Sequence, residues 1–150
     1  MKCALASMGF INGDLRHNKQ VILDTMTAYS GKADVVIFGE AFLQGFYAAA
    51  FDAAHDTQFD ENVKEIKQLR PDAVFWPVYT DFNSNEWNNT IKHEYAAQAN
   101  RFCKTVLYVN SYCKDKLGSD FAKGGAALFQ DGTIRAEIPS GKEGVLLVDI

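Results

Sequence analysis

The feature that most constrains the fold is a pair of apolar strand patterns with an amphipathic helix between them. Residues 3–8 form a short apolar run, and residues 33–38 are nearly continuous in apolar and β-branched side chains. A strand of the second kind is typical of a parallel sheet that is covered on both faces. The stretch 18–30 has one apolar face at helical spacing, formed by Val21, Ile22, Thr25, Met26 and Tyr29. Gly31 follows as a stop signal, so the sequence predicts a β-α-β unit.

The second half of the chain continues this alternation and then changes it. In chain order we expect a helix marked by Val63, Ile66 and Leu69 that ends before Pro71, a strand over 73–76, a helix over 87–102, and strands over 105–110, 125–129, 134–138 and 144–148. An Asp-Gly turn within residues 130–133 predicts a hairpin. The predicted class is α/β with an antiparallel closing section, and 150 residues fit a single domain over 1–150.

Charge and composition exclude several classes of partner. The chain has 15 basic and 19 acidic residues and no Lys or Arg run that could follow a phosphate backbone, so we expect no nucleic-acid partner. The sequence has no stretch typical of a membrane span or a signal peptide, which predicts a cytoplasmic protein. The cysteines lack C-x-x-C spacing, the histidines lack metal-ligand spacing, and no glycine-rich nucleotide motif occurs. We therefore expect no cofactor and no bound metal.

One stretch fits the α/β pattern badly. Residues 39–60 contain no clear strand, although residues 48–54 could form a helical turn. A loop of that length inside a compact domain is uncommon unless it is functional. The start of this stretch is therefore the first place to look for a site.

Glu40 stands at that start, just past the end of the predicted parallel strand. Ligands and catalytic groups of α/β proteins gather at the carboxyl ends of such strands. A carboxylate enclosed there by Phe38, Phe42 and Phe46 would be partly desolvated, which would raise its pKa and suit it to act as a general base. The alternative interpretation is a solvated glutamate in a loop.

The residues around Glu40 resemble a known motif. Residues 38–46, Phe-Gly-Glu-Ala-Phe-Leu-Gln-Gly-Phe, are similar to the strand-end glutamate motif of the carbon–nitrogen hydrolase family, the nitrilase-like amidases. Phe59-Asp60-Glu61 resembles the Phe-Pro-Glu that follows the family's nucleophile. The likeness extends over nearly the whole chain. The strand over 2–8 and the helix after Asn18 look like the family's first β-α-β unit, 71–77 resembles the strand after the nucleophile, 93–110 the helix and strand that end in Asn, and 124–145 the closing hairpin.

This resemblance implies a four-layer α-β-β-α sandwich and a Glu-Lys-Cys triad that hydrolyses C–N bonds of small amides or nitriles. In that chemistry the thiolate attacks the carbon, the Glu moves the proton, and the Lys stabilises the developing charge. Only the Glu is matched, at Glu40. The family's Lys and Cys lie between the two motifs, and here Gln58 passes directly to Phe59. The resemblance therefore implies an incomplete sandwich with an internal deletion near 58–59, and a chain that is inactive alone.

None of the three cysteines matches the family's nucleophile. Cys3 falls in a predicted buried strand and Cys103 at a junction between helix and strand, which favours packing roles for both. Cys113 is the best substitute, because it follows a strand in a polar stretch beside Lys114 and Lys116, which could lower its pKa.

Two other interpretations stay open. The same scaffold could be a non-catalytic binding or assembly module, because loss of central strands would expose sheet edges and apolar faces and so favour a homo-oligomer. The chain could also be an unrelated small α/β domain whose motif matches are accidental. Ammonia release from simple amides, together with labelling of one cysteine by a thiol reagent, would distinguish an enzyme from both.

Overall fold

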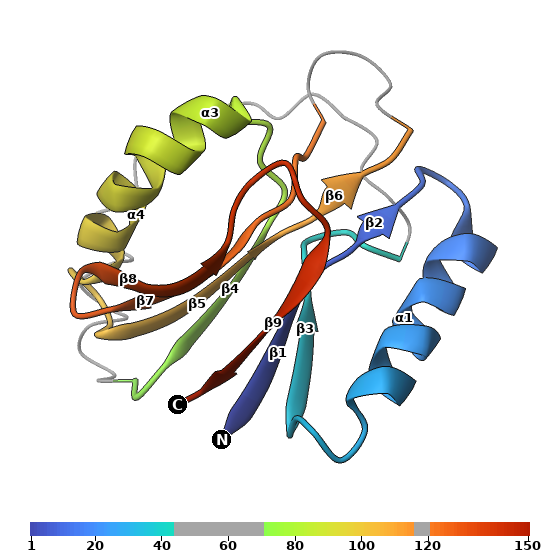
Figure 1. The fold of residues 1–150 in the computed structure, drawn as a ribbon, viewed down its shortest axis with the longest axis horizontal. Coiled ribbons are helices and arrows are strands. Elements are labelled where there is room, and N and C mark those ends of the chain that lie inside the picture. Colours follow the sequence, from blue (N-terminus) through green and yellow to red (C-terminus); the bar gives the residue numbers. More distant parts are fainter. Residues whose placement is uncertain (44–70, 116–120) are drawn as a thin grey trace.

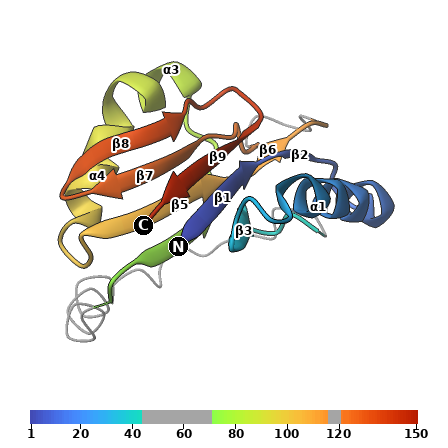
Figure 2. The same ribbon diagram turned by 60° about the horizontal axis from the view of Figure 1, so that its bottom comes forward.

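Two β-sheets pack face to face, and helices cover both outer faces (Figure 1). The structure is a computed structural model that describes residues 1–43, 71–115 and 121–150. Figure 2 shows the layers from a second direction, with α1 on one side of the sheets and α3 and α4 on the other. The layer order is therefore α-β-β-α, and the predicted α/β class is confirmed.

The first sheet contains the predicted β-α-β unit. It has the strand order β3-β1-β9, with β1 at Lys2–Ser7, β3 at Val35–Phe38 and β9 at Gly144–Asp149. Strand β1 runs parallel to β3 and antiparallel to β9. The helix α1, Leu15–Tyr29, connects β1 to β3 by way of the short strand β2 at Gly9–Phe10.

The second sheet has the order β4-β5-β7-β8. Its strands are β4 at Val74–Val78, β5 at Thr105–Asn110, β7 at Ala126–Gln130 and β8 at Thr133–Ile138. Strands β4 and β5 are parallel, and the rest of the sheet is antiparallel. A third, two-stranded sheet pairs β2 with β6 at Tyr112–Cys113.

The predicted strands are confirmed with small shifts at their ends. The hairpin between β7 and β8 is confirmed too, because Asp131 and Gly132 have φ of 50° and 75°, the left-handed pair that a tight hairpin turn requires. The helix expected over 87–102 is divided into α3 at Ser84–Glu86, a π-helical turn at Trp87–Ile91 and α4 at Lys92–Ala99. The turn expected over 48–54 and the helix expected before Pro71 lie outside the described residues.

The apolar face expected for α1 is wrong in part. Thr25, expected on this face, is buried, but Met26 is 52% exposed, and the helix also buries the polar residue Asn18. Asn18 tolerates burial because its amide group is fully used: Oδ1 accepts from Ile11 N at 2.9 Å, and Nδ2 donates to the carbonyls of Ile11 and Leu43 at 2.8 and 3.0 Å. The helix also begins earlier than predicted, at a cap where Asp14 Oδ1 accepts from His17 N at 3.0 Å.

Apolar side chains fill the space between the sheets and the space beneath α4. The buried cluster between the sheets consists of Cys3, Leu5, Leu107, Val109, Ala126, Leu128 and Val148. Beneath α4, Trp87 stacks on Tyr108 with ring centroids 4.9 Å apart. The ion pair of Lys92 with Glu137, 2.8 Å long, holds α4 against β8. Together these contacts fix the two sheets and place the strand ends described next.

Candidate functional site

The carboxyl ends of β1, β3, β4 and β5 lie at one end of the sandwich, the upper end in Figure 1. Glu40 follows β3 at this end, as expected from the sequence. Its backbone is held by the second sheet: Glu40 N donates to Val78 O at 3.2 Å, and Ser111 N donates to the same carbonyl at 3.2 Å. The end of β3 is therefore joined to the ends of β4 and β5 through one acceptor.

A side chain completes this junction. Ser111 Oγ donates to Glu40 O at 2.9 Å, and Ser111 is fully buried. The approach is so close that a Cβ at Gly39 would lie 2.3 Å from both Ser111 N and Ser111 Oγ. Only glycine fits at position 39, because the segment after β3 lies so close to Ser111. The sequence prediction did not use the polar residues after β5, which include Ser111.

The carboxylate of Glu40 points to solvent, because the residue is exposed. The enclosure expected from Phe38 and Phe42 is therefore wrong. The physical reason is that Phe42 turns inward, where it is 4% exposed and packs against the ring of Phe10 at a centroid distance of 5.8 Å. Phe46, the third aromatic residue of the expected enclosure, lies outside the described residues.

Further buried polar groups tie the loops together beside Glu40. Asn110 Nδ2 donates to the carbonyls of Thr80 and Gly124 at 2.9 and 3.2 Å, and its Oδ1 accepts from Thr80 N at 3.0 Å. Ser7 Oγ accepts from Gly125 N at 2.8 Å. These groups have their hydrogen bonds within the protein, so they shape the site and leave chemistry to the exposed carboxylate.

Two lysines lie at the same end of the sandwich. Lys123 Nζ donates to the backbone carbonyl of Asp81, and Lys123 is the bridge partner of Tyr112, next to Ser111. Lys114 pairs with Glu143 at 3.2 Å, and the same Glu143 oxygen accepts from Gly9 N at 2.6 Å. Both cations are thus engaged with groups other than Glu40.

Cys113 does not occupy the polar loop that was expected for it. It belongs to β6, is 1% exposed, and its Sγ donates to Asp115 Oδ1 at 2.7 Å, while Lys114 pairs elsewhere. An adjacent carboxylate disfavours a thiolate, and Lys114 is paired with Glu143, so the expected activation by Lys114 is wrong. Lys116, the other lysine of that expectation, lies outside the described residues. Although burial acts to raise the pKa of Asp115, hydrogen bonds from Cys113 and Asn12 outweigh it and lower that pKa below its ordinary value. Cys3 and Cys103 are also buried, and burial raises the pKa of Cys3.

Within residues 1–43, 71–115 and 121–150, no group of three or more His, Cys, Asp or Glu side chains could hold a metal ion. No helix in the described part of the chain is long and apolar enough to cross a membrane.

The fold and the strand-end glutamate define a class of α/β sandwich in which two sheets meet at their carboxyl ends. This is the nitrilase-like fold. The chain is similar to an amidase from Nesterenkonia AN1, with a TM-score of 0.74 and 14% identity over 100% of this chain and 92% of that one. A cysteine-to-alanine variant of the Nesterenkonia AN1 amidase, described as belonging to the nitrilase superfamily, gives a TM-score of 0.74 at 14% identity over 100% and 90% of the two chains.

A second kind of enzyme shares the fold. The glutamine-dependent NAD+ synthetase of Acinetobacter baumannii gives a TM-score of 0.71 at 14% identity, over 97% of this chain and 44% of that one. No family model matches the sequence, and no curated protein matches it. At this identity the likeness establishes the fold, so the activity is a matter for proposal.

Proposed function

We propose that this chain is a carbon–nitrogen hydrolase relative that keeps the general base of the family, Glu40, and does not turn over an amide or a nitrile by itself. The observation that carries the proposal is the position of Glu40 on a nitrilase-like fold, immediately past β3 and fixed there by Val78 and Ser111. The likeness to two amidase structures supports small amides as the substrate class in complete relatives.

The proposed lack of turnover follows from the absence of a nucleophile matching the family's cysteine. A general base accelerates amide hydrolysis by accepting a proton from a nucleophile as that nucleophile attacks the carbonyl carbon. The three cysteines are buried, and Cys113 is held by a carboxylate. An acyl-enzyme intermediate needs an attacking side chain, so Glu40 alone forms none.

The decisive experiment combines an intact mass with peptide mapping across Gln58 and Phe59. We expect a mass of 16.7 kDa, a continuous peptide through that junction, no ammonia from simple amides and no cysteine labelled above background. Additional peptides between Gln58 and Phe59 would contradict the proposal, and we would then expect a Lys and a Cys among them. Ammonia release that Glu40→Gln abolishes would contradict it as well.

Exposed apolar side chains favour a second candidate, an assembly module on the same scaffold that forms a homo-oligomer. Leu15, Leu23 and Met26 on α1 are 55%, 48% and 52% exposed, and β3 and β4 each stand at the edge of a described sheet. Exposed apolar faces and open strand edges promote association. Light scattering distinguishes the candidates, because a monomer at all concentrations contradicts the assembly module.

A further inference from the structure

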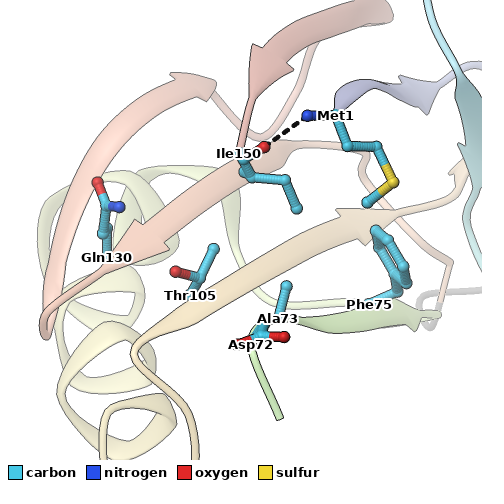
Figure 3. Close-up of a pocket in the computed structure, with 7 residues that line it drawn as sticks. All are labelled: Met1, Asp72, Ala73, Phe75, Thr105, Gln130 and Ile150. Carbon is cyan, nitrogen blue, oxygen red and sulfur yellow. Dashed lines mark hydrogen bonds between the residues drawn. The ribbon is translucent and has the colours of Figure 1, made fainter.

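A pocket of about 440 Å³ opens between the two sheets at the end opposite Glu40 (Figure 3). Its lining comes from the starts of β1 and β4, the ends of β7 and β9, and the start of β5: Met1, Asp72, Ala73, Phe75, Thr105, Gln130 and Ile150. This volume falls in the range of roughly 300–1,000 Å³ that is usual for small-molecule sites. The pocket is separate from the residues of the proposed function.

The pocket lies on the inner face of the second sheet. Phe75 pairs with Leu107, and Thr105 pairs with Gln130. Side chains alternate along a strand, so these residues share the inner face that Leu107 contributes to the core between the sheets. Opposite them stand Met1 and Ile150, and among the described residues part of this inner face stays accessible. Phe75 is consequently 40% exposed and Met1 52% exposed.

Three polar side chains stand around this apolar surface without partners in the described part of the chain: the Asp72 carboxylate, the Thr105 hydroxyl and the Gln130 amide. The Met1 amino group is already engaged, because it donates to Ile150 O at 2.6 Å. Asp72 is thus the one ionised side chain among the described residues of the lining. Arg101 and Lys104 line a neighbouring depression that Asp72 also borders.

We propose that this pocket binds a small organic cation, with an aromatic or aliphatic body and a primary ammonium head. The body would lie on Phe75, Met1 and Ile150. An ammonium carries three donors and no acceptor, and the Asp72 carboxylate accepts hydrogen bonds. A charge-assisted bond to Asp72 orients the head, and burial of Phe75 against the body supplies the apolar contribution. This inference goes beyond the proposed function and does not rest on it.

The test is an NMR titration of the 15N-labelled protein with 2-phenylethylammonium. The matched probes are 2-phenylethanol, which keeps the body without the charge, and 3-phenylpropanoate, which reverses the charge. We expect saturable shifts at the amides of Thr105, Gln130 and Ile150, and binding of the alcohol about tenfold weaker, as for loss of one charge-assisted hydrogen bond. Equal affinity for the alcohol, tighter binding of the carboxylate through Arg101 and Lys104, or no saturable shift at these amides would overturn the proposal.

Two variants and a control test whether Asp72 binds the ammonium and Phe75 binds the apolar body. Asp72→Asn should weaken the ammonium about tenfold and leave the alcohol unchanged, and Phe75→Ala should weaken both probes. Asp131→Asn removes the same charge at the hairpin turn outside the pocket, where asparagine also accepts a positive φ, so it should change neither affinity. A loss of ammonium binding in Asp131→Asn as large as in Asp72→Asn would overturn the assignment to Asp72. The unliganded spectrum of each variant reports its folding.

Discussion

The hydroxyl of Ser111 donates a hydrogen bond of 2.9 Å to the backbone carbonyl of Glu40, 71 positions away in the chain. The bond crosses from the end of one sheet to the end of the other. It therefore fixes the backbone of Glu40 against the second sheet, and Ser111 itself is fully buried. Ser111→Ala removes this donor and leaves the carbonyl of Glu40 without its partner.

We expect Ser111→Ala to lower the free energy of unfolding by about 1–2 kcal/mol, the usual cost of a lost hydrogen bond with a buried partner. Urea unfolding at neutral pH measures the change. The matched control is Ser30→Ala, because Ser30 is exposed at the end of α1 and its side chain has no hydrogen bond to a described residue. A cost for Ser111→Ala no greater than that of Ser30→Ala would show that the bond contributes nothing to stability.

A second prediction concerns the space at Gly39. A methyl group in Gly39→Ala would lie 2.3 Å from the backbone nitrogen of Ser111, which a small side-chain movement cannot relieve. We expect a loss of about 1–3 kcal/mol or more, as for an overpacked core. Gly31→Ala is the control, since a Cβ at Gly31 would meet nothing within 4 Å and its cost of about 1 kcal/mol would come from its positive φ alone. Thermal unfolding that ranks Gly31→Ala as the more damaging change would be inconsistent with this contact.

A third prediction compares two leucines. Leu107 is fully buried between the sheets, whereas Leu147 on β9 is 46% exposed. Leu107→Ala should therefore cost about 2–5 kcal/mol of unfolding free energy, because it leaves a cavity in the core between the sheets. Leu147→Ala should cost clearly less by the same urea titration. Similar losses for the two variants would mean that the sheets do not pack through Leu107.

A fourth prediction concerns pH. Hydrogen bonds from Cys113 and Asn12 hold the pKa of Asp115 below its ordinary value despite the opposing effect of burial. The carboxylate therefore stabilises the folded chain above the ordinary pKa of an aspartic acid, and this contribution disappears as the pH falls through the lowered pKa. Asp115→Asn should be less stable than the native chain at neutral pH, with a difference that narrows on acidification. Asp131→Asn serves as the control, and a difference for Asp115→Asn that is constant over the whole acidic range would refute the linkage.

Most of the strands could be predicted because each carries its own signal. The residues of β3 are apolar on both faces, and the Asp-Gly turn before β8 permits only a tight hairpin. These signals are local. They remain valid whatever the rest of the chain does, which is why their limits agree with the structure to within a few residues.

The features that could not be predicted depend on contacts between distant segments. Asn18 is polar and was not assigned to the core, but carbonyls of Ile11 and Leu43 accept its hydrogen bonds and make its burial possible. The place of Glu40 could be read from the end of a strand. Its exposure could not, because it depends on Phe42 packing against Phe10. The residues next to Glu40 in the sequence do not show that Phe42 packs against Phe10.

Met1 and Ile150 lie side by side, joined by hydrogen bonds of 2.6 Å from Met1 N to Ile150 O and 3.0 Å from Ile150 N to Met1 O. The backbone of residue 1 and that of residue 150 thus lie next to each other at one end of the sandwich. Chain ends that lie this close together can be joined, and new ends can be opened at an exposed turn elsewhere. A short glycine linker between these two residues, with new ends opened at the exposed turn of Asp131 and Gly132, should give a circular permutant that keeps both sheets.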